Sequence, residues 1–366
     1  MDRNIKQVLH MMGGAGENSY AANSRLQERA ILQTRSVMEE VIEELCNTIA
    51  AETLVVADLG CSCGPNAFRV ISQVVASVEG HCIRSGLRPP EIQFFLNDLP
   101  GNDFNSLFHY LSLEGKRARD VKAGEDVPLY FMGLPGSFYE RLFPQRSVHF
   151  FHTSYSLMWL SQVPRGLEDL ESNIYLTEES SPRSWKMYLE QYKSDFSRFL
   201  KLRSKELFFG GRMILTLLGR RKPSTCGELT HLWRLLSDAL RDMVDEGLVQ
   251  GDILNACKFP QYAPLMEEVT TIVKMEGSFC IEEAHTFEST WDPLDESNED
   301  VVLDEVSSGK NVATSIRAVA EPLLSNHFGD GIIDDLFSRY AKNVARHMLK
   351  GKPKYLVFVL LLKLKE

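Results

Sequence analysis

Apolar residues follow two alternating patterns along the first 220 residues of the chain. They recur at helical spacing from Leu26 to about Ile49, and again over roughly 66–84. Short apolar runs, which are typical of buried strands, stand between these helices and after them. The runs are Leu54–Ala57, Ile92–Leu96, Leu129–Met132, Val148–Phe151, Ile174–Leu176 and Met213–Leu218. This alternation of strands and helices predicts a parallel sheet with helices on both faces.

The pattern changes after Gly219, where helical spacing dominates. Amphipathic helices are predicted at 228–247, 264–276, 310–327 and 331–349, with an acidic, serine-rich loop at 295–308. The run Tyr355–Leu362 predicts a last strand that returns to the sheet, whereas the polar, glycine-rich residues 1–24 predict a loop or arm. We therefore expect an α/β domain made of 1–220 and 350–366, with a mostly helical cap over 221–349.

Composition narrows the class of protein. The 366 residues are 44% hydrophobic and 25% charged, which is ordinary for a globular chain. With 40 basic and 50 acidic residues the formal charge is −10, which argues against a nucleic-acid partner. The seven scattered cysteines indicate reduced thiols. The N-terminus lacks the apolar core of a signal peptide, and the longest apolar run falls short of the roughly 20 residues that span a bilayer. We expect a cytoplasmic protein without a membrane partner.

The segment Asp58-Leu59-Gly60-Cys61-Ser62-Cys63-Gly64 predicts a ligand site at a strand end. Its G-x-x-x-G spacing fits neither a dinucleotide fingerprint nor a Walker A loop. An acidic residue before the glycines repels a pyrophosphate but can attract S-adenosylmethionine, which carries a sulfonium and an ammonium group. The next strand ends at Asp98, whose carboxylate can accept both ribose hydroxyls of an adenosyl group. Downstream, Leu134–Tyr139 offers a turn, a hydroxyl and aromatic faces for an adenine ring.

Each of these signals also has a purely structural interpretation. Asp58 can cap a helix, Asp98 can form a turn, and the glycines can end helices. Their combination on successive strands favours the adenosyl site. His152 follows a predicted strand, and a packed or hydrogen-bonded histidine is the better interpretation of it.

Several longer blocks make the chain similar to a known family. It resembles the plant carboxyl methyltransferases of the SABATH family, whose members act on salicylate, benzoate, jasmonate, indole-acetate or xanthine alkaloids. The salicylate and benzoate branch is the most similar. The resemblance runs nearly end to end, and it is carried by Val8–Met11, Gly13–Tyr20, Asn23-Ser24, Ala57–Asn66, Phe95–Phe104, Pro135–Pro144, Ser154–Pro164 and Arg317–Leu323.

The resemblance implies a Rossmann-like S-adenosylmethionine-dependent methyltransferase sheet with an α-helical cap, and a homodimer. It implies cofactor contacts at Tyr20, Ser24, Asp58, Cys61, Asn66, Asp98, Leu99, Ser137, Phe138, Ser154, Tyr155 and Ser156. It places the substrate carboxylate at Gln27 and Trp159. The remaining substrate pocket would comprise Tyr155, Met158, Leu232, Trp233, Tyr262, Ile316, Val319 and Tyr355 or Phe358.

Some positions depart from the family pattern. Many relatives that methylate acids have a lysine where this chain has Met12, so Gln27 and the Trp159 indole N–H, with Arg25 as a possible aid, would hold the carboxylate. A magnesium site reported for some members matches Leu170, Asn255, Cys257 and Lys258, which are poor ligands for an oxygen-preferring cation. We therefore predict no metal.

The expected chemistry is methyl transfer to the carboxylate of a small aromatic acid of the salicylate or benzoate type. A carboxylate is ionised at neutral pH, so no catalytic acid or base is required. From spacing alone Trp159 would be core packing, and Met158 suits the edge of an aromatic ring. Jasmonate, indole-acetate, anthranilate and a xanthine nitrogen remain alternative acceptors. An inactive paralogue is a further alternative, against which the intact Asp58, Asp98, Gln27 and Trp159 argue.

Overall fold

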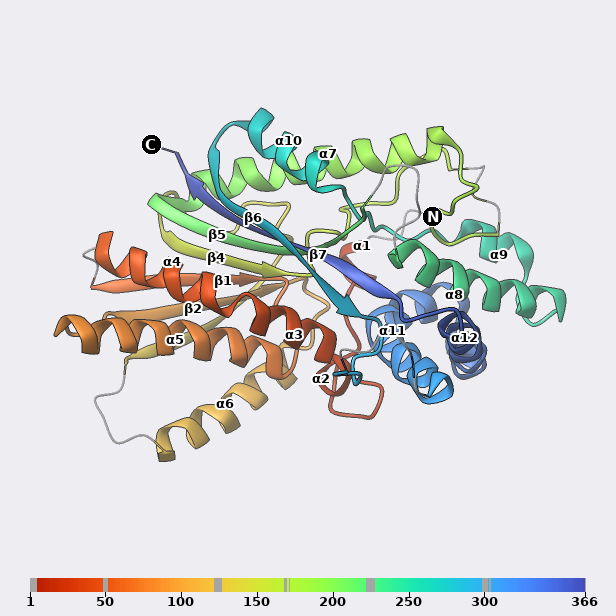
Figure 1. The fold of residues 1–366 in the computed structure, drawn as a ribbon, viewed down its shortest axis with the longest axis horizontal. Helices are drawn as coiled ribbons and strands as arrows, with labels where there is room; N and C mark the ends of the chain where they lie inside the picture. The colour runs from red at the N-terminus through yellow and green to blue at the C-terminus, as the bar shows by residue number, and fades with distance from the viewer. Residues whose placement is uncertain are drawn as a thin grey trace.

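The structure is a computed structural model. It describes residues 5–48, 52–121, 127–167, 172–221, 228–297 and 304–365, together with Leu170 and Val302. The strands of these residues form one seven-stranded sheet in the order β3-β2-β1-β4-β5-β7-β6 (Figure 1). The strands are β1 (Thr53–Leu59), β2 (Glu91–Asp98), β3 (Leu129–Pro135), β4 (Val148–Ser154), β5 (Leu207–Gly219), β6 (Phe279–Thr290) and β7 (Lys354–Leu364).

Strand direction gathers the polar strand ends at one edge of the sheet. β1 pairs in parallel with β2 and β4, β2 with β3, and β4 with β5, whereas β7 is antiparallel to both β5 and β6. In this register Asp58 lies beside Leu96 on one neighbouring strand and His152 on the other. The carboxyl ends of β1 to β4 therefore meet, and ligands of open parallel sheets bind at this edge.

Helices cover both faces of the sheet, as Figure 1 shows. One face carries α4 (Arg35–Thr48), α5 (Pro65–Ser85) and α6 (Phe104–Val121), and the other carries α7 (Pro182–Glu206) and α10 (Met266–Glu276). Because side chains alternate across a strand, Val56 belongs to the core under α4 and α5, whereas Ala57 belongs to the core on the α7 side.

Helix α5 illustrates how the local sequence builds these layers. Gly64 precedes it as the N-cap, Pro65 occupies its first turn, and Gly86 ends it in the left-handed conformation with φ +65°. Pro is preorganised for a first turn and Gly for a helix end. Val70, Ile71, Val74 and Val78 recur at helical spacing and are buried against the sheet.

A second group of helices lies beyond the carboxyl ends of the strands. It comprises α8 (Glu228–Asp245), α9 (Gly251–Ala256), α11 (Glu305–Phe328), the 3₁₀ helix η1 (Asp330–Ile332) and α12 (Ile333–Met348). Of the N-terminal elements, α1 (Ile5–Val8) and α2 (Tyr20–Asn23) contact α11, whereas α3 (Arg25–Gln33) packs against α4 and α5 (Figure 1). None of the helices within the described ranges combines the length and apolarity needed to cross a membrane.

The predicted α/β class with a Rossmann-like sheet is confirmed, and so are the helices now called α5, α8, α10, α11 and α12 and the strand β7. The helix predicted from Leu26 to Ile49 is instead two helices. It breaks at Thr34, whose hydroxyl donates to the carbonyls of Ala30 and Ile31 and satisfies the end of α3. Residues predicted as an N-terminal loop include the short helices α1 and α2.

One expected strand is absent from the sheet, and one observed strand was not expected. Ile174–Leu176 is buried but lies outside the sheet, because the Ile174 N–H donates to Ser237 Oγ and its carbonyl accepts from Phe259 N. A short apolar run cannot distinguish a strand from another buried segment. In the other direction, β6 lies within 221–349, the range assigned to the helical cap, and pairs with β7 along its length. The division of the chain at 220 and 349 stays a prediction.

Candidate active site

The turn after β1 requires glycine at two positions. Gly60 has φ +77° and Gly64 φ +107°, which L side chains rarely adopt. A Cβ on Gly60 would lie 2.6 Å from Ser156 Cβ, and one on Gly64 would lie 2.7 Å from Ala21 Cα. The backbone N–H of Gly60 donates to Asn97 O at 2.8 Å, which joins this turn to the end of β2. The glycines therefore let β4, α2 and the turn approach closely around one space.

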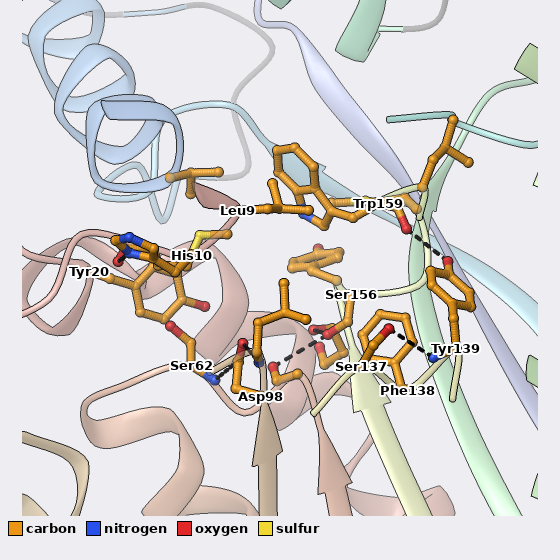
Figure 2. A pocket seen from close by; sticks show the side chains of 18 of the residues that line it. Leu9, His10, Tyr20, Ser62, Asp98, Ser137, Phe138, Tyr139, Ser156 and Trp159 are labelled. Carbon is orange, nitrogen blue, oxygen red and sulfur yellow. Dashed lines mark hydrogen bonds between the residues drawn. The ribbon is translucent and has the colours of Figure 1, made fainter. Parts of the chain in front are cut away.

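Asp98 ends β2 with its carboxylate turned toward that turn (Figure 2). Its Oδ2 accepts the Ser62 N–H at 2.7 Å, and its Oδ1 accepts the Leu99 N–H at 2.7 Å. Burial raises the pKa of Asp98 to about 6, against the lowering effect of the two backbone hydrogen bonds. A carboxylate has roughly four acceptor positions, so Asp98 can still accept from two ligand hydroxyls.

Asp58 is placed differently from Asp98. Its Oδ1 lies 2.8 Å from Nδ1 of His152, and both side chains are buried in the sheet. This confirms His152 as a buried, hydrogen-bonded histidine. Asp58 is not among the residues that line the cavity described below, so its contact with a cofactor stays a prediction.

The end of β4 carries a strained residue into the site. Tyr155 has φ +56°, which is rare for a bulky side chain, and its N–H donates to Thr216 O at 2.8 Å. Strain of this kind costs about 1–3 kcal/mol and clusters at functional sites. Next to it, the Ser156 hydroxyl donates to Gly60 O at 3.3 Å, so β4 and the glycine turn support each other.

These elements line a cavity whose volume of about 860 Å³ includes space that is open to solvent. Figure 2 shows Asp98, Ser137 and Phe138 on one side and Leu9 and Trp159 on another. The lining residues are Leu9, His10, Met11, Tyr20, Gln27, Gly60, Ser62, Asp98, Leu99, Ser137, Phe138, Tyr139, Ser154, Tyr155, Ser156, Met158, Trp159, Leu160, Ser161 and Val319.

Four polar atoms at the cavity are buried without a hydrogen-bond partner among the described residues. They are Gln27 Oε1, Ser62 Oγ, Ser154 Oγ and the Tyr155 hydroxyl. Leaving such an atom unsatisfied costs about 1–3 kcal/mol, which a polar ligand can recover. The lining includes no Lys or Arg among the described residues, so a phosphate-bearing ligand is disfavoured. The acceptors of Asp98 with the apolar faces of Leu99 and Phe138 fit an adenosyl group without phosphates.

Figure 2 shows Trp159 at the end of the cavity away from Asp98, and the lining also includes Gln27 and the apolar residues Met158, Leu160 and Val319. Hydrogen bonds hold the 158–160 segment from two directions. Trp159 O accepts from the Tyr139 hydroxyl at 2.7 Å, and Leu160 N donates to Pro260 O at 2.7 Å. This end can hold a flat apolar group whose polar edge faces Gln27 and Trp159.

Twelve of the residues expected at the site line the cavity: Tyr20, Gln27, Asp98, Leu99, Ser137, Phe138, Ser154, Tyr155, Ser156, Met158, Trp159 and Val319. Ser24, Cys61 and Asn66 lie just behind it, where Asn66 Nδ2 donates to Ser24 O at 3.0 Å. Leu9, His10, Met11, Leu160 and Ser161 line the cavity but were not expected there, and Ser62 and Tyr139 line it as members of the segments Asp58–Gly64 and Leu134–Tyr139 that were predicted to face a ligand. Each of these seven residues lies in one of the sequence blocks that carry the family resemblance, and for the first five that position was the only indication of a site role in the sequence.

The remaining residues expected in the substrate pocket are core residues of the cap and of β7, outside the lining. Leu232, Trp233, Tyr262, Ile316, Tyr355 and Phe358 are all buried. The indole of Trp233 donates to Gln261 Oε1 at 2.6 Å, and the Tyr262 hydroxyl lies between Arg220 and Glu268. Partners of their own hold these side chains in the cap, so contact with a substrate stays a prediction for them.

The residues that match a magnesium site in relatives are engaged in local contacts. Asn255 Oδ1 accepts from Ser172 N, and Asn255 O accepts from the Lys258 ammonium. Across the described residues no group of three or more His, Cys, Asp or Glu side chains could hold a metal. The expectation of a metal-free site stays a prediction.

Comparison with known proteins gives consistent matches along the whole chain. A family model described as SAM dependent carboxyl methyltransferase matches residues 6–365. Anthranilate O-methyltransferase 1 of Zea mays is 44% identical, covering 98% of both chains. A benzoic acid/salicylic acid carboxyl methyltransferase of Petunia hybrida is 44% identical, covering 96% of this chain and 97% of that protein. The solved structure of a loganic acid methyltransferase with SAH superposes with a TM-score of 0.82 at 30% identity, covering 97% of this chain and 99% of that chain.

Proposed function

The chain belongs to the family of SAM-dependent carboxyl methyltransferases, and we propose that the acid it methylates is a small aromatic one of the salicylate or benzoate type. The observation that carries the choice of acid is the mixed lining of the cavity. It combines the apolar side chains of Met158, Leu160 and Val319 with the neutral donors of Gln27 and Trp159. Relatives named for benzoic and salicylic acid at 44% identity support it.

Bound S-adenosylmethionine supplies a methyl group on a positively charged sulfur. The acid needs no base, because a carboxyl group titrates near pH ~4 and is ionised at neutral pH. We assign Asp98 to the ribose hydroxyls and Phe138 to the adenine face. Gln27 has two amide N–H donors and Trp159 one, and these hold the carboxylate without competing as nucleophiles.

The task of the site is to align acid and methyl group and to exclude water. Alignment alone lowers such barriers by about 7–11 kcal/mol in the best cases. When a carboxylate oxygen forms its bond to the methyl carbon, the carbon–sulfur bond breaks and its electron pair stays on sulfur. The products are a methyl ester and S-adenosylhomocysteine. The buried His152 is hydrogen-bonded to Asp58 and takes no part as a base.

Anthranilate is the second candidate acid, because a relative at 44% identity is named for it. It shares the benzene ring and carboxylate, and differs from salicylate in its ortho amino group. We also propose that the protein is cytoplasmic, as expected from its sequence, and that it forms the homodimer that the family resemblance implies. Light scattering on the purified protein would distinguish a dimer from a monomer.

The first experiment is labelled methyl transfer across a panel of salicylate, benzoate, anthranilate, jasmonate, indole-acetate and a xanthine. We expect the highest kcat/KM for a benzene-ring acid. A higher kcat/KM for jasmonate or the xanthine would contradict the choice of acid. Transfer to none of them would favour the inactive paralogue.

A second experiment tests the role of Trp159. Trp159→Phe keeps an aromatic ring but removes the N–H, so kcat/KM for the acid should fall about tenfold, the value of roughly 1.4 kcal/mol for one hydrogen bond. Affinity for S-adenosylhomocysteine should be retained. Trp185→Phe makes the same change on α7, outside the cavity lining, and should leave turnover intact. Unchanged turnover in Trp159→Phe would exclude the assigned role.

A further inference from the structure

Arg203, near the end of α7, is a buried cation with three separate partners. Its side chain is 0% exposed, and its Nε forms a 2.7 Å ion pair with Glu206, which is also 0% exposed. Its Nη1 donates to Phe138 O at 2.8 Å and its Nη2 to Glu140 O at 2.9 Å. The planar fork of a guanidinium can meet three acceptors at once, which an ammonium cannot do in this geometry.

Glu206 adds further hydrogen bonds to the loop after β3, which also contains Phe138 and Glu140. Its Oε1 accepts the backbone N–H of Leu142 at 2.8 Å and that of Phe143 at 3.2 Å. Arg141 lies 3.2 Å from the same oxygen. The pair from α7 therefore satisfies backbone groups on four residues of the loop after β3. Burial lowers the pKa of Arg203, the neighbouring Glu206 opposes that shift, and the charge of Arg141 adds a smaller lowering effect.

The residue between the two clamped carbonyls is Tyr139. Its own N–H donates to Ser137 Oγ at 3.2 Å, and its hydroxyl donates to Trp159 O at 2.7 Å (Figure 2). Ser137 and Phe138 line the cofactor end of the cavity, and Trp159 lines the acid end. Tyr139 therefore connects the Ser137–Phe138 wall of the cavity to Trp159. Arg203 fixes the backbone on both sides of Tyr139.

We propose that Arg203 is a positioning residue for methyl transfer, which acts through Tyr139 to set the position of Trp159 relative to Phe138. The inference rests on the proposed function, because it takes Trp159 as a donor to the carboxylate. An in-line transfer depends on the distance between cofactor and acid, and this network joins the two walls that hold them. A misplacement of about 1 Å can cost about a hundredfold in rate.

An ion pair that served only the core would need no contact with the loop. Here both Nη atoms bind the carbonyls that flank Tyr139, and the ring of Phe138 also packs edge-on against Phe199 of the same helix, with centroids 6.1 Å apart. The network therefore predicts separable effects on the cofactor and on the acid, which loss of core stability alone does not produce.

The test compares Tyr139→Phe with Arg203→Lys in the full-length protein. Tyr139→Phe removes only the hydroxyl, so we expect salicylate, titrated against the protein saturated with S-adenosylhomocysteine, to bind about three- to tenfold more weakly. The Kd for S-adenosylhomocysteine should stay within about twofold. Arg203→Lys keeps the charge beside Glu206 but frees a carbonyl of the loop, so both affinities should fall by about fivefold or more, and kcat with them.

Two matched controls make the same substitutions elsewhere. Tyr130→Phe alters a half-exposed tyrosine of β3, and Arg198→Lys alters an exposed arginine of α7. Both should leave the two affinities and kcat unchanged. In a double-mutant cycle the Arg203→Lys/Tyr139→Phe protein should lose less in kcat than the product of the single losses, because both variants interrupt one connection.

Three results would overturn the proposal: an unchanged salicylate affinity and kcat in Tyr139→Phe, an equal loss of both affinities in that variant, or full multiplicativity in the cycle. If Arg203→Lys fails to fold, Tyr139→Phe still decides the point. If the wild-type protein binds and methylates no aromatic acid, the proposed function fails. The acid that it does use then replaces salicylate in the cycle, and without any acid the proposal about Arg203 falls too.

Discussion

The carboxylate of Asp98 accepts a 2.7 Å hydrogen bond from the backbone N–H of Ser62, which joins the end of β2 to the glycine turn after β1. Ser62 has φ +53°, and the Asn102 amide donates to its carbonyl at 3.0 Å. The turn is therefore held from both sides of the peptide. This arrangement leaves the other acceptor positions of Asp98 facing the cavity, where a ribose would need them.

The raised pKa of Asp98 predicts that cofactor binding weakens in acid. Hydroxyl donors stabilise the ionised carboxylate, so binding requires loss of the proton that Asp98 carries below its pKa of about 6. The affinity for S-adenosylhomocysteine should fall as the pH drops through about 6, by up to about tenfold per pH unit. Calorimetric titration between pH about 5 and 8 measures this.

Asp98→Asn is the control for that profile. The amide cannot titrate, so the variant's affinity for S-adenosylhomocysteine should be lower at neutral pH and nearly flat across the same range. The raised pKa also means that Asp98 favours the folded, cofactor-free protein below about pH 4, and that this contribution is lost as the pH rises through about 6. Equal slopes in wild type and Asp98→Asn would contradict the assignment.

Substitutions at Gly60 and Gly14 can distinguish the cost of backbone strain from the cost of a steric clash, because the two glycines have the same φ. Gly60 and Gly14 both have φ +77°, but a Cβ on Gly14 would meet nothing within 4 Å. An L residue at such a φ costs about 1–2 kcal/mol. Gly14→Ala should show only that cost, whereas Gly60→Ala also displaces Ser156 and should weaken S-adenosylhomocysteine binding by about tenfold or more. Thermal unfolding and calorimetry measure both effects, and equal affinities in the two variants would refute the prediction.

Gln27 is predicted to face the carboxylate of the acid. Gln27→Glu places a like charge there, and two such charges in a partly buried site repel by about 1–4 kcal/mol. We expect kcat/KM for the acid to fall about tenfold or more at low salt, less at high salt. Gln33→Glu adds the same charge at an exposed position of α3 and is the matched control. If both variants lose activity equally, the effect comes from net charge and not from position 27.

The family resemblance implies a lysine at the position that Met12 occupies in this chain. Its N–H donates to Ala318 O at 2.8 Å and its carbonyl accepts the Tyr20 N–H at 2.8 Å, so the backbone is fixed beside the cavity. The Met12 side chain is not part of the lining. Met12→Lys should lower KM for the acid by about three- to tenfold with kcat nearly unchanged, through attraction of about 1 kcal/mol across solvent. Met12→Gln, which lacks the charge, should leave KM for the acid unchanged. An unchanged KM in both variants would show that the side chain at position 12 does not reach the acid.

Features of the site that depend on a single strand end could be predicted from the sequence. Gly60 and Asp98 stand directly after short apolar runs, and the carboxyl ends of parallel strands meet at one edge whatever the rest of the chain does. The same holds for Ser137 and Ser154 at the ends of β3 and β4. The family resemblance added Gln27, Trp159 and Val319, which no periodicity singles out, and the structure places all three at the cavity.

Other features were decided by partners distant in the sequence. The apolar run Ile174–Leu176 reads as a strand, yet its backbone bonds to Ser237 and Phe259 of the cap. The polar atoms of Trp233 and Tyr262 bond to Gln261, Arg220 and Glu268, which no local pattern in the sequence indicates, and their contact with a substrate stays a prediction. β6 was missed because exposed residues alternate with partly buried ones along this edge strand, which leaves no continuous apolar run.

The sequence by itself therefore determined the strand ends, the glycine turn and the acidic residue of the cofactor site, because local backbone geometry and strand direction suffice for these. Only the tertiary structure decided which segments of the chain line the cavity and which contacts fix their positions. Arg203 shows the reason: a charged residue in a long helix looks like a surface position, and only the folded chain brings its guanidinium to carbonyls about sixty residues earlier, on both sides of Tyr139. Burial then makes those contacts obligatory, since a buried charge without partners would be costly.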